Sequence, residues 1–325
     1  DYGIESPLSI APTGLFTYDS SFMSAYGVGK DFYIKDGEVT YGYNQEGFKE
    51  YLKMMRQWYQ DKLIDQQFDT RNTGTSVDTT DAYYLGDDAG AYISIFSYNR
   101  NAMYASYRWT DKESYWRQPV PAPVLNEGDE LHLGVETTYA GTYPMVISTD
   151  NQYPEITCQF LDYLYTDEGF MLINYGIEGV SYTIGEDGKI HASEDITDNP
   201  QGFDFSHVKQ AYHTWFNVVG LYTYLQSEED FADPLVYEGY EIWASNTDGA
   251  WLYPAKASLT TEESARYTAA FNDINTYVTE NVVKFIFGYA DIDAEWDNYV
   301  KTIEDLGIQE CIDIKQASYD RYMAR

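Results

Sequence analysis

The last third of the chain carries the feature that most constrains its fold, a long helical region with marked ends. Thr260 and Glu263 have the Thr-x-x-Glu spacing of a capping box, in which each side chain satisfies a free backbone N–H at a helix start. The helix predicted from this point ends at Gly288, because glycine readily adopts the left-handed conformation that closes a helix. A helix of this length needs a large partner surface to bury its apolar side.

A second helix is predicted directly after it, in the acidic run 291–297. Carboxylates are favourable at a helix start, where the backbone dipole is positive, and we expect Asp293 to be the N-cap. Three apolar residues at helical spacing face inward, and Gly307 ends the helix. The inward residues are Trp296, Val300 and Ile303. A final segment then runs to Tyr322.

The rest of the chain mixes helices with short apolar strands, which is typical of the α/β class. Asp36-Gly37 lies in the middle of an alternating segment, 32–41, and predicts a tight hairpin. Further strands are predicted at 6–10, 91–96 and 143–148, and helices at 154–165 and then to about 175. A helix after Asn44 is predicted to face a core with Phe48, Tyr51, Leu52, Met55, Trp58, Tyr59 and Leu63.

Charge and aromatic content limit the ligands that such a chain can bind. Its 20 basic and 53 acidic residues give a net charge of −33, which repels phosphate backbones, so we expect no nucleic-acid binding. Tyrosine is unusually abundant, with 34 residues. A tyrosine ring stacks on apolar faces while its hydroxyl bonds polar groups. This combination fits sugars, although most of these tyrosines must simply be core residues.

Cysteine and histidine provide no sign of a metal site. Cys158 and Cys311 are the only cysteines, and we expect two free thiols, with a disulfide left open. The four histidines show no zinc-binding spacing. We therefore expect neither metal nor cofactor. No apolar stretch approaches the roughly 20 residues that cross a bilayer.

Three blocks of the sequence together resemble one protein family. The first is the hairpin and helix at 36–65, and the second is the leucine-rich helix with its Thr-Asp-Glu-Gly turn at 160–179. The third is the helical tail with its closing Tyr-Asp-Arg-Tyr at 319–322. In this order they are similar to extracellular solute-binding proteins (family 1 type) of bacterial carbohydrate ABC importers, in the lipoprotein branch of gut Firmicutes.

The resemblance implies a periplasmic-binding-protein-like α/β fold of type II, in which hinge closure of two lobes holds the ligand. The chain looks like the C-terminal two-thirds of such a protein, mainly its second lobe with a partial first lobe. Residues 1–120 and 179–325 would build the second lobe, and 121–178 would cross and return to the first. The strand at 143–148 would then lack its sheet neighbours.

The implied function is to bind a sugar or oligosaccharide outside the cell without chemical change, as a component of an ABC importer. The implied partners are a small-molecule carbohydrate and the transporter's permease subunits. We expect a monomer that is lipid-anchored at the extracellular face of the membrane in its full-length form, with an anchor outside this chain.

Ligand contacts are expected in loops at strand ends, where open α/β sheets bind ligands. Aromatic rings would stack on pyranose faces, while charged groups would hydrogen-bond sugar hydroxyls. Ordinary core packing is the alternative for each aromatic residue. The candidates are Tyr18, Asp19, Phe96, Tyr98, Arg100, Trp251 and Tyr253.

Two other functions compete with the receptor. A glycoside hydrolase also uses aromatics and carboxylates, but with 53 acidic residues a carboxylate pair carries no information, and no catalytic motif is present. A calcium-stabilised module is prompted by the acidic run 291–297 and by Asp87-Asp88. Neither matches an EF-hand loop, and helix capping explains the run better.

Overall fold

The computed structural model describes ten stretches of the chain, which fall into two compact units. The described residues are 6–9, 22–70, 89–92, 119–133, 145–197, 211–212, 239, 241–243, 245 and 247–325. The first unit comprises Asp1–Ser94, Pro121–Glu136 and Trp243–Arg325, and the second comprises Ile95–Val120 and Thr137–Ile242. The lobe boundaries expected at residues 120 and 178 stay a prediction.

A small parallel sheet forms where the sequence predicts its first strand. Strand β1 (Ser6–Ser9) pairs in parallel with β4 (Ala89–Tyr92) in the register Leu8 to Ala91. On the other side of β1, Leu8 bridges to Ile64, because its N–H donates to the Leu63 carbonyl at 2.9 Å. Three segments far apart in sequence therefore meet at β1, as expected of an α/β fold.

The predicted hairpin is present as β2 (Phe32–Lys35) and β3 (Glu38–Tyr41). Its turn residues Asp36 and Gly37 have φ of 55° and 82°. Positive φ at both turn positions matches the twist of the flanking strands, which is why an Asp-Gly pair favours this hairpin.

Helix α1 (Glu46–Gln60) follows the hairpin and buries one apolar side, as predicted. Its fully enclosed side chains are Phe48, Tyr51, Leu52 and Met55. The predicted inward position of Leu63 is wrong, since Leu63 lies beyond the helix end and is 41% exposed. Helical spacing holds only while the helix lasts.

The C-terminal region contains α10 (Thr261–Phe287), α11 (Ile292–Asp305) and α12 (Ile308–Met323). The capping box at Thr260 and Glu263 is formed, and Gly288 closes α10 in the left-handed conformation, so both predictions are confirmed.

The predicted N-cap of α11 is wrong by two residues. Asp291, not Asp293, accepts the Ala294 N–H at 2.8 Å. Asp293 instead pairs with Lys53 at 2.8 Å and Lys49 at 3.3 Å, which ties α11 to α1. In a run of alternating carboxylates, the first that precedes the helical backbone becomes the cap, and the next is left free for ion pairs.

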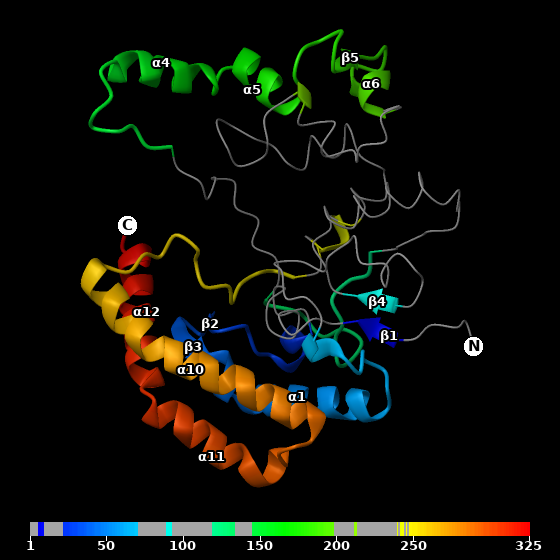
Figure 1. Cartoon of the computed structure of the whole chain (residues 1–325), viewed down its shortest axis with the longest axis vertical. Coiled ribbons are helices and arrows are strands. Elements are labelled where there is room, and N and C mark those ends of the chain that lie inside the picture. Colours follow the sequence, from blue (N-terminus) through cyan, green and yellow to red (C-terminus); the bar gives the residue numbers. More distant parts are fainter. Residues whose placement is uncertain are drawn as a thin grey trace. The chain divides into compact units, whose positions relative to one another are not determined.

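These elements surround one large core. Helix α10 packs against α1 and α12, and α12 packs against β3 (Figure 1). The buried centre includes Tyr41, Phe48, Phe285, Trp296 and Tyr299. Short 3-10 helices lie at Met23–Tyr26, Gly42–Asn44 and Phe68–Thr70.

The second unit has a smaller core among its described residues. Its helices are α4 (Pro154–Tyr163), α5 (Asp167–Asn174) and α6 (Glu194–Thr197), and its hairpin consists of β5 (Tyr182–Ile184) and β6 (Ile190–Ala192). Tyr175, Tyr182 and Ile196 are buried together at its centre. Both predicted helices are confirmed within two residues of their ends.

The strand predicted at 143–148 is wrong over its described part. Residues 145–148 form no strand, and Val146 is 88% exposed. Among the described residues no strand pairs with this segment, and an isolated strand has no partner for its backbone donors and acceptors.

Candidate functional site

Trp251 lies where three segments of the first unit join. Its N–H donates to the His132 carbonyl at 2.9 Å, and its carbonyl accepts from the Ile34 N–H of β2 at 2.8 Å. The Asp248 N–H donates to the Leu131 carbonyl at 3.1 Å. These bonds fix the backbone of the loop 247–253 between β2 and the segment 131–133.

The indole ring of Trp251 is partly exposed and is held among three other side chains. Its centroid is 6.1 Å from that of Tyr33, with the rings stacked, and 4.6 Å from that of His132. The Lys35 ammonium lies 4.9 Å from the indole centroid, within cation–π range. Tyr33 is buried, and burial raises its pKa to about 12, so it remains a neutral stacking partner.

His132 also contacts a carboxylate. Its Nδ1 lies 2.9 Å from Asp248 Oδ2, and the other carboxylate oxygen of Asp248 accepts the Ala250 N–H at 2.9 Å. The Ala250 N–H and, second, the His132 ring hold the pKa of Asp248 below its usual value. The pair and the indole form one cluster, hereafter the Trp251 cluster: Tyr33, Lys35, His132, Asp248 and Trp251.

Tyr253 has a different environment on the opposite side of β2. Its hydroxyl donates to the Lys315 carbonyl of α12 at 3.0 Å. The Lys315 ammonium lies 4.8 Å from the Tyr253 ring, 5.0 Å from Tyr267 and 5.7 Å from Phe32. Burial lowers the pKa of Lys315. Because Phe32 and Tyr33 are successive strand residues, they point to opposite faces, and so the two predicted aromatics Trp251 and Tyr253 join different clusters.

The remaining predicted contacts fall elsewhere. Tyr18, Asp19, Phe96, Tyr98 and Arg100 lie outside the described residues. Their roles as ligand contacts stay predictions, as do those of Trp251 and Tyr253. Sequence reasoning missed His132, Asp248 and Lys35. His132 and Asp248 are 116 positions apart, and no local pattern marks such a pair.

No grouping of three or more metal-binding side chains occurs among the described residues. In the acidic run at the start of α11, Asp291 serves as the N-cap and Asp293 pairs with two lysines. These partners account for both carboxylates. Asp87-Asp88 lies outside the described residues.

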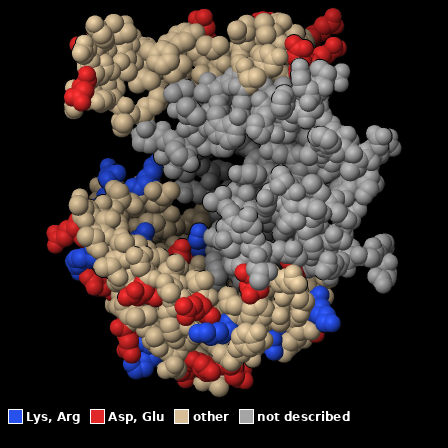
Figure 2. All heavy atoms as spheres, in the orientation of Figure 1, with Lys and Arg blue, Asp and Glu red and all other residues tan. Residues whose placement is uncertain are grey.

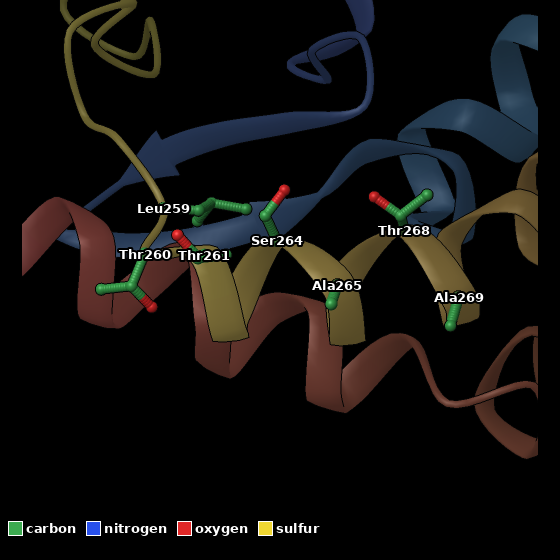
Figure 3. A pocket seen from close by; sticks show the side chains of 7 residues that line it. All are labelled: Leu259, Thr260, Thr261, Ser264, Ala265, Thr268 and Ala269. Carbon is green, nitrogen blue, oxygen red and sulfur yellow. The ribbon is translucent and has the colours of Figure 1, made fainter.

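A hollow runs along the first turns of α10 (Figure 3). Apart from Leu259 its lining side chains are small, and none of them carries a charge. They are Leu259, Thr260, Thr261, Ser264, Ala265, Thr268 and Ala269. The stripe offers hydroxyls but neither an aromatic ring nor a charged group, so the Trp251 cluster is the stronger candidate for recognition of a ligand.

The second unit exposes an apolar surface. Helix α4 buries none of its side chains, and Ile156 and Phe160 are 63% and 58% exposed. The visible surface over α4 and α5 shows few charged side chains (Figure 2). Nearby exposed apolar residues are Val146, Tyr153, Tyr165, Leu172, Ile177 and Val180. Large apolar side chains that gather on one surface are typical of an interaction site.

Solved structures identify the architecture. An HMO-binding, ABC-transporter-associated solute-binding protein from Bifidobacterium longum infantis superposes with a TM-score of 0.67 at 19% identity, over 98% of this chain and 65% of its own. The alginate-binding protein AlgQ2 superposes with a TM-score of 0.65 at 20% identity, over 97% of this chain and 64% of its own. The chain has the fold of solute-binding proteins. This confirms the predicted periplasmic-binding-protein-like α/β class.

A curated relative agrees with this fold. The fructooligosaccharide ABC transporter substrate-binding protein FusA of Streptococcus pneumoniae is 25% identical over 320 residues, which cover 93% of this chain and 54% of FusA. The chain thus spans about half the length of that relative. No protein-family model matches the chain. Within the described part of the solute-binding fold, no helix has the length and hydropathy that a membrane crossing requires.

Proposed function

We propose that this chain belongs to the substrate-binding component of a carbohydrate ABC importer, which binds an oligosaccharide and releases it unchanged. The match to FusA along 93% of the chain, together with the solute-binding fold, carries this proposal. FusA is described as a fructooligosaccharide-binding protein, and solved relatives bind HMO or alginate. The shared ligand chemistry is that of an oligosaccharide.

The Trp251 cluster is the part of the described structure that suits a sugar best. An indole ring stacks on the C–H face of a pyranose or furanose, and the Lys35 ammonium beside it can hydrogen-bond hydroxyls. Trp251 and Tyr253, with Tyr18, Asp19, Phe96, Tyr98 and Arg100, remain the proposed ligand contacts.

The exposed apolar side of α4 fits a protein that is larger than this chain. About one-third of each solved relative lies outside the part that this chain matches, since the chain covers 64% or 65% of them. We propose that this further part of the fold covers Ile156 and Phe160. Removing the two side chains from water then contributes a few kcal/mol, at about 1.5–3 kcal/mol per large apolar side chain.

The proposal extends to partners and location. The receptor would act outside the cell as a monomer, lipid-anchored in its full-length form, and deliver its ligand to permease subunits. A surface with a net charge of −33 fits this location and disfavours nucleic acid. No residue of the chain would be catalytic.

Calorimetric titration with kestose, HMO and alginate oligosaccharides tests the function. Saturable binding of at least one saccharide, with that saccharide recovered unchanged by chromatography after prolonged incubation, is the expected result. If none of these saccharides binds, the proposed substrate-binding function is contradicted. Shorter products that disappear on replacement of one Asp or Glu would establish a glycoside hydrolase instead.

A further inference from the structure

We propose that His132 and Asp248 are positioning residues that hold the Trp251 ring in place for a saccharide. The inference rests on the proposed function, in which Trp251 contacts the sugar. Neither residue touches the ligand in this role. They act on the indole, which does.

The contacts around Trp251 form a closed ring of interactions. The backbone carbonyl of His132 accepts a hydrogen bond from the backbone N–H of Trp251, and the His132 ring lies 4.6 Å from the indole centroid. Asp248 holds the His132 ring through Nδ1 at 2.9 Å. Asp248 in turn lies in the same loop as Trp251, with its N–H bonded to the Leu131 carbonyl at 3.1 Å. Each residue therefore restrains the next.

The indole needs such support because it lies in a loop. Residues 247–249 and 252–254 belong to no helix or strand, and Trp251 is only partly buried, so burial alone does not fix its side chain. Tyr33 supports one part of the ring, and Lys35 is an exposed, long side chain with many rotamers. Among the described residues the imidazole is a second rigid neighbour of the indole, and the carboxylate of Asp248 holds that imidazole in its orientation.

A ring that is held before the ligand arrives loses less conformational freedom on binding. Immobilising one side chain at an interface costs about 0.5–1.5 kcal/mol. Without the His132–Asp248 pair this cost falls on the binding step, and we expect affinity to decrease about three- to tenfold. The backbone bonds of Trp251 remain, so the fold should not change.

The test compares His132→Ala and Asp248→Ala with a matched control. The control is His191→Ala, which removes another exposed His–Asp pair, His191 with Asp187 at 3.2 Å, in the second unit. Asp248→Asn retains a group that can hydrogen-bond both His132 and Ala250, and it should bind close to wild type. Trp251→Phe should lose most of the affinity.

Two measurements are made on the full chain. The first is the dissociation constant of the saccharide that the wild type binds best in the series of kestose, HMO and alginate oligosaccharides. The second is the indole N–H resonance of Trp251, assigned by its loss in Trp251→Phe. We expect it to shift and broaden in His132→Ala and Asp248→Ala, and to stay in place in His191→Ala.

The outcomes separate this inference from the function on which it rests. If the wild type binds no saccharide of the series, the proposed function and the role of Trp251 are both overturned. If the wild type binds and His132→Ala and Asp248→Ala bind equally well, only the inference is overturned. An unmoved Trp251 resonance in both alanine variants also overturns it.

Discussion

Gly288 offers a direct test of how the end of α10 is held. It has a φ of 73°, and a Cβ built at this position would lie 2.2 Å from Cζ and Nη2 of Arg56. The Arg56 guanidinium also donates from Nη1 to the Ile286 carbonyl at 3.1 Å. Gly288→Ala thus imposes a strained backbone and displaces a charged donor from a helix end.

Two contributions determine the expected loss of stability. A left-handed conformation costs an L-residue about 1–2 kcal/mol. Displacing Arg56 also weakens its hydrogen bond to the Ile286 carbonyl. Complete loss of a hydrogen bond from a charged group costs about 1.5–3 kcal/mol. Because a flexible guanidinium can swing aside and find water, we expect about half of that loss, and a total of roughly 2–4 kcal/mol for Gly288→Ala.

Gly307 provides the matched control. It has a φ of 93° at another helix junction, and nothing lies within 4 Å of a Cβ built there. Gly307→Ala should therefore cost only the backbone contribution of about 1–2 kcal/mol. Urea unfolding followed by circular dichroism gives each free energy of unfolding, and a double-mutant cycle with Arg56→Ala isolates the contact.

In the Arg56→Ala background, Gly288→Ala should cost no more than Gly307→Ala. The reasoning is refuted if the two glycine variants lose equal stability when Arg56 is present, or if Arg56→Ala leaves the cost of Gly288→Ala unchanged.

Three further predictions follow from burial and charge. The hydrogen bonds from Arg321 hold the pKa of Glu263 at about 2, below its usual 4.5, so its stabilisation is complete above pH 4.5 and is lost as the pH falls to 2. The melting temperature of Glu263→Gln should therefore fall less between pH 6 and pH 3 than that of the wild type. An equal fall in both proteins would contradict the ion pair. Phe48→Ala, at 0% exposure, should cost about 3–5 kcal/mol in urea unfolding, whereas Phe160→Ala, at 58%, should change stability by less than about 0.5 kcal/mol, and similar costs would disprove the assigned burial. Cys158 is exposed, whereas Cys311 is buried with its pKa raised to about 11, so a disulfide-exchange reagent at pH 8 should label one thiol in the native chain and two in urea. Labelling of both thiols in the native chain would be the contrary result.

The sequence alone determined those parts of the fold that depend on neighbouring residues. The Asp36-Gly37 turn, the capping box at Thr260 and Glu263 and the glycine at 288 were all predictable, because each depends on the backbone preferences of a few neighbouring residues. The same holds for the four buried side chains of α1, which repeat at helical spacing.

Tertiary structure decided the rest. The pairing of β1 with both Ile64 and β4, the bond between His132 and Asp248, and the use of Asp293 in ion pairs with α1 join residues that are far apart in sequence. Which distant groups meet depends on packing across the whole unit, not on local preference. For the same reason the sequence selected Trp251 and Tyr253 as equivalent aromatics, whereas β2 separates them, because successive strand residues face opposite sides.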